Sequence, residues 1–171
     1  MNIHDGHIRP ITRDAGARPL VDVVIEIPRW SFLKRGSQGD IDFVSPLPCP
    51  FNYGSVPEYI GLEGDLLDAL VLGPRLPLGT HVRVPAWGAI RLMDRGLSDD
   101  KLVCSVVPPS QLELQRVLGF FQFYAKCKAL LNALRGQFGR NACDGWCDAG
   151  EAIARATPRL PGDAYRPSIR F

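Results

Sequence analysis

The chain has 171 residues, of which 46% are hydrophobic and 22% are charged, and its net charge is +2. That length suits one domain with a sizeable core, and the balance of 20 basic against 18 acidic residues gives no case for nucleic-acid binding. No apolar run approaches the roughly 20 residues of a membrane helix, and the N-terminal residues lack the pattern of a signal peptide. We therefore expect a cytoplasmic protein that binds neither nucleic acid nor a membrane.

The N-terminal third predicts an arm, a strand and a loop region. Residues 1–20 have little apolar periodicity and are expected to form an arm, with one domain over residues 21–171. Residues 21–28 form a β-branched run closed by Pro28, which predicts a strand. Glu26 is unusual there, since a strand tolerates a carboxylate only at its wet face. Residues 29–61 are rich in Gly and Pro, so we expect loops with at most a short strand near 42–44.

Three carboxylates then fall within six residues. The segment is Glu63-Gly64-Asp65-Leu66-Leu67-Asp68, and a strand is expected directly after it, over residues 69–73. Clustered carboxylates repel one another unless a cation lies among them, and Mg²⁺ is the usual partner of hard oxygen ligands. On these six residues alone a solvated acidic turn is the simpler interpretation, because Asp and Gly favour turns for conformational reasons.

The rest of the chain predicts strands followed by helices. A long strand over residues 81–93, interrupted by Pro85 and Gly88, leads through a polar loop over 94–101 into a strand over 102–107. Apolar residues then recur at helical spacing from Ser110 to about Arg135, and a short helix is expected over 149–156. Strands first and helices last predict an α+β domain with a small sheet or barrel covered by helices.

The five cysteines are odd in number and irregularly spaced, which favours reduced thiols. Cys143 and Cys147 have no second ligand pair near them, so a zinc site is not expected. Cys49 as a nucleophile would need a histidine base, and nothing in the sequence places His81 beside it.

Seven short motifs in register resemble the soluble family I inorganic pyrophosphatases over about residues 21–157. They are residues 24–28, Lys34, residues 50–54, residues 63–68, Asp94 with residues 99–103, residues 120–124, and Gly145-Trp146. The resemblance implies a mainly β, α+β fold, in which a five-stranded, OB-like closed β-barrel is flanked by two C-terminal helices. It also implies hydrolysis of pyrophosphate, a small phosphorylated substrate, by a metal-activated water, with Mg²⁺, or Mn²⁺ in its place, as cofactor and a homo-oligomeric assembly.

The same resemblance implies roles for individual residues. The metal ligands would be Glu26, Glu63, Asp65, Asp68, Asp94 and Asp99. Asp65 stands where the family has its general base, and Lys34, Tyr53, Lys101 and Tyr124 would contact phosphoryl oxygens or orient the ligands. The chemistry agrees with this set, because two metals that share a carboxylate both screen phosphoryl charge and acidify a bridging water.

The chain departs from the family pattern at several places. Glu63 and Leu66 replace an Asp and a Pro, and the residues expected to hold the departing phosphate have become Ile41, Cys49 and Ala125, with Gly36 in place of a glutamate. Losing two cations there would weaken binding by roughly 3–6 kcal/mol, or about 10² to 10⁴ in kcat/KM. Nearby substitutes are Arg35 and Lys128, whereas Lys126 is turned away from Tyr124 and is expected to be a solvated surface residue.

Three functions stay open on the sequence. The first is a working inorganic pyrophosphatase with compensating cations. The second is a hydrolase of an organic phosphate or diphosphate ester, because the side that would hold the departing phosphate has become apolar. The third is a non-catalytic protein that binds a phosphorylated ligand, against which the retention of Asp65 argues.

Overall fold

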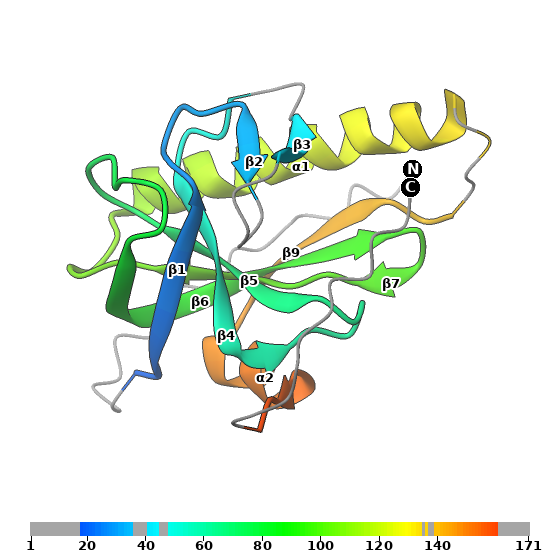
Figure 1. The fold of residues 1–171 in the computed structure, drawn as a ribbon. Helices are drawn as coiled ribbons and strands as arrows, with labels where there is room; N and C mark the ends of the chain where they lie inside the picture. The colour runs from blue at the N-terminus through cyan, green and yellow to red at the C-terminus, as the bar shows by residue number, and fades with distance from the viewer. Residues whose placement is uncertain (1–17, 36–40, 45–47, 135, 137–138, 161–171) are drawn as a thin grey trace.

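The computed structural model describes residues 18–35, 41–44, 48–134, 136 and 139–160, with side chains excepted at 33–35 and 41–44. The predicted arm over 1–20 lies almost wholly outside these residues, so the arm and the domain boundary stay predictions. Two helices and ten strands are present in the described part (Figure 1). None of its helices combines the length and the apolarity that spanning a membrane requires.

Five strands close into a barrel. In spatial order they are β1 (Leu20–Ile27), β4 (Asn52–Ile60), β5 (Leu66–Val71), β8 (Lys101–Cys104) and β6 (His81–Asp94). β6 pairs back onto β1, which completes the circle, and only the β5–β8 pair within the circle is parallel. This confirms the predicted closed five-stranded barrel. Each of the five strands pairs with a neighbour on both sides, so the sheet has no free edge strand.

The remaining elements surround the barrel. They are β2 (Leu33–Arg35), β3 (Ile41–Val44), β7 (Leu97–Ser98), α1 (Gln111–Leu134), β9 (Ala142–Cys147), α2 (Ala149–Arg155) and β10 (Thr157–Pro158). β7 and β9 pair with β6, β10 pairs with β4, and β2 pairs with β3. The two helices lie on different sides of the barrel, α1 across the top of the view and α2 at the bottom (Figure 1).

Side-chain alternation along the strands divides the core in two. The barrel interior holds residues such as Val23, Val56 and Leu102, and the alanines of α2 pack against this cluster. The outer face holds a second cluster that includes Leu70 and Ile90 from the barrel and Val117 and Phe121 from α1. Successive strand residues point to opposite faces, so β4, β5, β6 and β8 contribute to both clusters, whereas β1 contributes to the first alone.

Both predicted helices are confirmed and have clear end signals. Ser110 and Glu113 form a capping box, in which the Ser110 N–H donates to Glu113 Oε2 over 2.8 Å and the Glu113 N–H donates to Ser110 Oγ over 3.3 Å. Beyond the end of α1, Gly136 takes a φ of 67°, which glycine adopts without strain. Asp148 caps α2 by accepting hydrogen bonds from the N–H groups of Gly150 and Glu151.

The short strand expected near 42–44 is confirmed as β3, but the expectation of loops over the rest of residues 29–61 was wrong, because β4 is a central strand between β1 and β5. The predicted obstacle, Pro57, lies where the β4–β5 register shifts between Val56 and Ile60, and a proline at such an irregularity removes no regular ladder bond. The short strands β2, β7 and β9 were also missed. The predicted strand over 102–107 is shorter than expected, since β8 ends at Cys104 and Val106 is 75% exposed.

The predicted interruption of β6 at Pro85 and Gly88 is instead a bulge within one strand. Ala86 and Ala89 both belong to the barrel interior, although they are three residues apart, so the extra residue reverses the alternation. Beyond the bulge, Ile90 and Leu92 face α1. Asp94 follows on the same face by alternation, so the bulge determines on which side of the barrel this carboxylate emerges.

Gly54 is where β1 and β4 approach most closely. A Cβ atom there would lie 2.0 Å from the backbone oxygen of Val24, a contact that side chains never make. We expect Gly54→Ala to lower the free energy of unfolding by about 2–4 kcal/mol, because the strands must separate. In the control, Gly119→Ala, the new Cβ on α1 meets nothing within 4 Å, and a gain of about 0.5–1 kcal/mol is expected. Urea unfolding of both variants measures this, and equal stabilities would contradict it.

Candidate metal centre

The centre is built on a row of residues that cross-strand pairing brings side by side. Ser55 on β4 pairs with Asp68 on β5, and Asp68 pairs with Lys101 on β8. Paired residues point to the same face of a sheet. The next residues on that face, Leu70 and Val103, belong to the apolar cluster under α1. The row therefore continues the outer face of the barrel at the point where its apolar cover ends.

Two loops bring further carboxylates to this row. Glu63, Asp68 and Asp99 each offer an oxygen, and these oxygens lie within 4.8 Å of one another. The turn that presents Glu63 is closed by a 2.7 Å hydrogen bond from the Gly61 N–H to the Asp65 carbonyl. Asp99 is held by its own N–H, which donates to the Leu92 carbonyl over 2.9 Å. Within the described residues, no other group of three potential ligands comes this close together.

The Lys101 ammonium donates to both Asp68 and Asp99, and all three side chains are buried. Burial by itself would lower the pKa of Lys101, but the two carboxylates raise it well above its usual value. Burial would raise the pKa of Asp99, and Lys101 holds it below its usual value instead. This lysine is therefore charged at neutral pH and neutralises part of the cluster.

The pKa values of Glu63 and Tyr53 are raised, unlike that of Asp99. Burial, together with Asp99 and Asp68, raises the pKa of Glu63 to about 9 against the opposing effect of Lys101. Glu63 is thus protonated at neutral pH when no metal is bound. Burial, with Asp68 next to it, also raises the pKa of Tyr53 well above its usual value, so this phenol keeps its proton. The Lys101 ammonium lies 5.8 Å from the centre of the Tyr53 ring.

The residues fit a hard divalent cation such as Mg²⁺. All the clustered ligands are carboxylate oxygens, which Mg²⁺ prefers. Glu63 Oε2 is buried and has no hydrogen-bond partner, which is costly unless a cation or water satisfies it. A divalent ion would also take the place of the Glu63 proton, because metal ligands bind in the deprotonated form.

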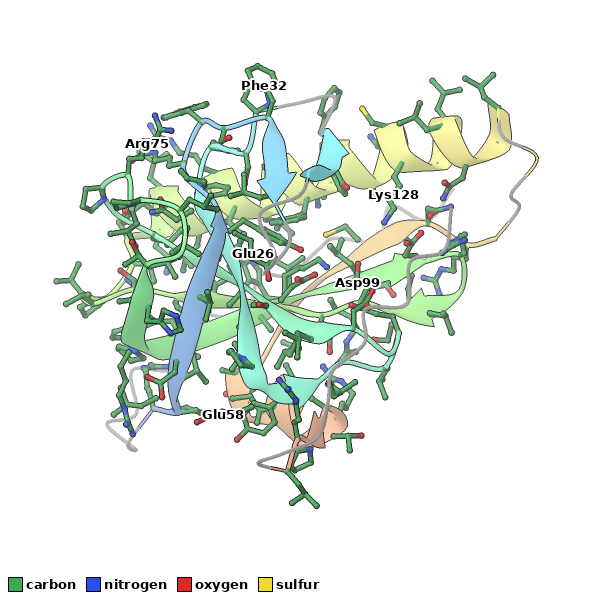
Figure 2. The ribbon with its side chains drawn as sticks, in the orientation of Figure 1. Glu26, Phe32, Glu58, Arg75, Asp99 and Lys128 are labelled. Atoms are coloured by element: carbon green, nitrogen blue, oxygen red, sulfur yellow. The ribbon has the colours of Figure 1, made fainter. Side chains whose placement is uncertain are left out.

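The other predicted ligands lie around this group and not within it. Glu26 stands at the β1–β4 register shift between Ile25 and Ile27, and it accepts a 2.6 Å hydrogen bond from Ser55 Oγ. Asp65 is half-buried in the turn that carries Glu63. Asp94 ends β6, and its Oδ2 accepts from the Lys128 ammonium over 2.7 Å. Figure 2 shows Glu26, Asp99 and Lys128 on the same side, between the barrel strands and α1.

A depression next to the cluster joins Asp94 and Asp99 to α1. Tyr124, Ala125 and Lys128 from the helix line it. Tyr124 thus lies at the edge of the site, and its catalytic role stays a prediction. Lys128 shares this face of the helix, and its ammonium lies 6.0 Å from the Tyr124 ring. Lys126 is exposed, as predicted for a solvated surface residue.

The structure describes some of the positions at which the sequence departs from the family pattern. Cys49 and Ala125 are both buried and carry no charge, and burial raises the pKa of the Cys49 thiol to about 11, which makes it a poor nucleophile at neutral pH. Lys34, Arg35, Gly36 and Ile41 lie outside the described side chains. The proposed role of Lys34 therefore stays a prediction.

Sequence reasoning missed an ion pair that supports the cluster. Arg155 on α2 donates from Nε and Nη2 to Asp100 Oδ2 over 2.9 and 2.5 Å. The Asp100 side chain is only 5% exposed, and it is the residue between Asp99 and Lys101. The pair thus ties α2 to the segment that carries two site residues. No local pattern could reveal it, because the partners are 55 residues apart.

The fold and the site together define a class of protein, a small closed β-barrel with a buried carboxylate centre for a hard divalent cation. The family model described as "Inorganic pyrophosphatase" matches residues 23–130. The chain belongs to the inorganic pyrophosphatase family.

Individual relatives are named inorganic pyrophosphatases as well. The soluble inorganic pyrophosphatase 2 of Chlamydomonas reinhardtii is 35% identical over 131 residues, which are 63% of this chain and 66% of the relative. The inorganic pyrophosphatase of Haemophilus influenzae is 37% identical over 100 residues, 53% of this chain and 54% of the relative. The chain thus spans about half to two thirds of the length of these relatives.

The solved inorganic pyrophosphatase of Thermus thermophilus superposes with a TM-score of 0.62 at 27% identity, over 85% of this chain and 91% of that one. The one from Coxiella burnetii gives 0.62 at 26% identity, over 82% and 92%. These structures support the OB-like character predicted for the barrel.

The raised pKa of Glu63 predicts how stability depends on pH. In EDTA the folded protein keeps the Glu63 proton up to about pH 9, whereas an unfolded chain releases it near 4.5. The melting temperature should therefore fall as pH rises between these values, and this fall should be smaller in Glu63→Gln and in saturating Mg²⁺. Melting curves of wild type, Glu63→Gln and the exposed control Glu58→Gln across this range measure it. Parallel profiles for wild type and Glu63→Gln would rule it out.

Proposed function

We propose that this protein hydrolyses inorganic pyrophosphate to two phosphates in a Mg²⁺-dependent reaction. The observation that supports this best is the convergence of Glu63, Asp68 and Asp99 beside Lys101 and Tyr53, in a chain of the inorganic pyrophosphatase family. Carboxylates that bind metal and neighbouring groups that bind phosphoryl oxygens are what a phosphoanhydride hydrolase needs.

The metal would be held by Glu63, Asp68 and Asp99, with Glu26, Asp65 and Asp94 as outer ligands that act directly or through water. When bound, Mg²⁺, or Mn²⁺ in its place, would screen the charge of the phosphoryl oxygens and lower the pKa of a bound water. Asp68 and Asp99 of this set also accept hydrogen bonds from the ammonium of Lys101.

The chain's other polar groups would bind and orient the substrate. The protonated phenol of Tyr53 can donate a hydrogen bond to a phosphoryl oxygen, and the charged Lys101 can do the same from the neighbouring strand. Tyr124 would act from the helix, and Lys34 from β2. Asp65 would accept the proton of the attacking water as general base.

The test of the general base is Asp65→Asn. Removing a general base typically lowers the rate by about 10² to 10⁴, so phosphate release from pyrophosphate should fall by that factor while Mn²⁺ binding at the cluster is retained. Glu58→Gln, an exposed carboxylate far from Asp99 in Figure 2, should release phosphate at the wild-type rate. Undiminished activity in Asp65→Asn would refute the assignment.

A second candidate is hydrolysis of an organic phosphate or diphosphate ester. It is favoured by Cys49 and Ala125, which are buried and uncharged at the positions expected to bind the departing phosphate. Uncharged side chains at these two positions supply no cation for a second phosphate, and they would tolerate an organic leaving group.

A panel of substrates separates these functions. The first predicts that pyrophosphate gives the highest kcat/KM with Mg²⁺, and the second predicts that an ester such as a nucleoside diphosphate or a sugar phosphate exceeds it. Phosphate release is measured with Mg²⁺ and with Mn²⁺, and Asp68→Asn serves as the inactive control. Metal binding without release from any substrate would point instead to a non-catalytic binding protein.

We also propose a cytoplasmic homo-oligomer. Phe123, Leu130 and Leu134 are 55, 63 and 76% exposed, and their spacing places them along one face of α1. An apolar stripe of this kind supports association between copies of the chain. The soluble relatives support the location.

A further inference from the structure

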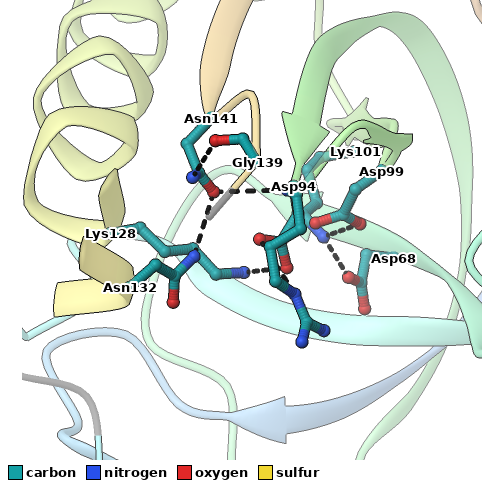
Figure 3. Close-up of polar contacts among 9 residues, drawn as sticks. Asp68, Asp94, Asp99, Lys101, Lys128, Asn132, Gly139 and Asn141 are labelled. Atoms are coloured by element: carbon teal, nitrogen blue, oxygen red, sulfur yellow. Dashed lines mark hydrogen bonds and ion pairs between the residues drawn. The ribbon is translucent and has the colours of Figure 1, made fainter. Parts of the chain in front are cut away.

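Two of the three clustered carboxylates are not held by the sheet. Asp68 belongs to β5, where pairing with β4 and β8 fixes its backbone. Glu63 lies in the turn before β5, and Asp99 lies in the link between β7 and β8. The position of Asp99 matters twice, because its carboxylate also accepts from the Lys101 ammonium (Figure 3). A metal centre of this kind needs a further contact that holds the link in place.

Asp100 points away from the cluster that its two neighbours join. Asp99 and Lys101 meet on the outer side of the barrel, whereas Asp100 lies on the side of Leu102 and Cys104, which face the barrel interior. Its side chain is only 5% exposed. A carboxylate buried in this way is stable only when cations or hydrogen-bond donors satisfy it.

Both oxygens of Asp100 have a donor. Arg155 donates to Oδ2 from Nε over 2.9 Å and from Nη2 over 2.5 Å, and Ser98 Oγ donates to Oδ1 over 3.4 Å. Arg155 is the last residue of α2, and its Nη2 also donates to Cys147 Sγ on β9 over 3.3 Å. Ala152 anchors the same helix in the barrel core. The guanidinium is thus held by two elements and holds the link in turn.

The same pair borders the other carboxylate that lies outside the strands. Asp100 and Arg155 line a small depression together with Glu63 and Ser98. This depression is on the α2 side of the cluster, whereas Tyr124 lines the one on the α1 side. The pair therefore lies next to both ligands whose positions the sheet leaves open.

We infer that Arg155 is a positioning residue of the metal centre, which acts through Asp100 to hold Asp99 and Lys101 in place. Its side chain donates to Asp100 and Cys147, and neither belongs to the carboxylate cluster. Without this tie the link would lose its support from α2, and Asp99 would be less well placed for a metal. The inference rests on the proposed function only in that the three-carboxylate group binds metal, and it does not depend on the substrate.

The test measures the Mn²⁺ affinity of the full-length chain without substrate, from the electron paramagnetic resonance signal of free Mn²⁺. Arg155→Gln should bind Mn²⁺ about 10–100-fold more weakly than wild type, the usual effect of removing a partner that orients a metal ligand. Charge alone predicts the opposite, because removing a cation near the cluster strengthens cation binding. Arg155→Lys keeps the charge and should bind more tightly than Arg155→Gln. The matched control is Arg140→Gln, an exposed arginine paired with Asp144, which should bind as wild type does.

A double variant separates positioning from charge and from stability. Arg155→Gln combined with Asp100→Ala keeps the net charge of wild type and leaves no unpaired charge at this position, so it should fold even where Arg155→Gln alone does not. It should lose the same 10–100-fold in affinity and no more, because both changes remove one tie. Circular dichroism and melting curves establish that each variant is folded at the temperature of the binding measurement.

The outcomes are distinct. Unchanged or tighter Mn²⁺ binding in folded Arg155→Gln, or wild-type affinity in the double variant with only a lower melting temperature, would overturn the inference and leave Arg155 a purely structural residue. A wild-type chain that binds no Mn²⁺ would overturn the metal centre and the inference together. Mn²⁺ binding by wild type without hydrolysis of pyrophosphate would instead refute the proposed function alone.

Discussion

The contact of the Lys101 ammonium with Asp68 and Asp99 is the interaction on which the site depends. Three buried charges would be very unfavourable apart, since each loses its water, and they are tolerated only because each has a partner in good geometry. The contact exists because β5 and β8 pair in parallel with Asp68 opposite Lys101. The barrel's register therefore also fixes the chemistry of the centre, because a one-residue slip of either strand would turn its charged side chain toward the apolar interior.

Strand alternation and bulges give the two faces of the barrel different side chains. The inner face supplies the apolar core, which α2 closes with its alanines. The outer face begins as an apolar surface under α1 and becomes polar toward Asp68 and Lys101. Alternation with the inward Ile25 places Glu26 on this outer face, and the bulge after Ala86 places Asp94 there. A rigid scaffold thus presents the acidic residues without placing them in the core.

The carboxylate cluster lies next to residues that depart from the family pattern. A glutamate, Glu63, contributes to the cluster, and its side chain is protonated until a metal binds. Ala125 makes part of the neighbouring depression apolar, whereas Lys128 adds a cation one turn further along the helix. Ala125 and Lys128 both line the depression that also contains Asp94 and Asp99.

Local sequence determined the elements with strong periodic signals, including the strand of residues 20–27 and both helices, and motif order was sufficient for the family. Tertiary structure decided the rest. Pro57 forbids a regular strand locally, yet β4 forms because its neighbours pair around an irregularity. Asp100 finds Arg155 55 residues away. Whether Asp94 reaches Lys128 depends on how α1 lies against the β6–β7 turn. Such outcomes are set by distances between segments far apart in the chain, about which residue spacing carries no information.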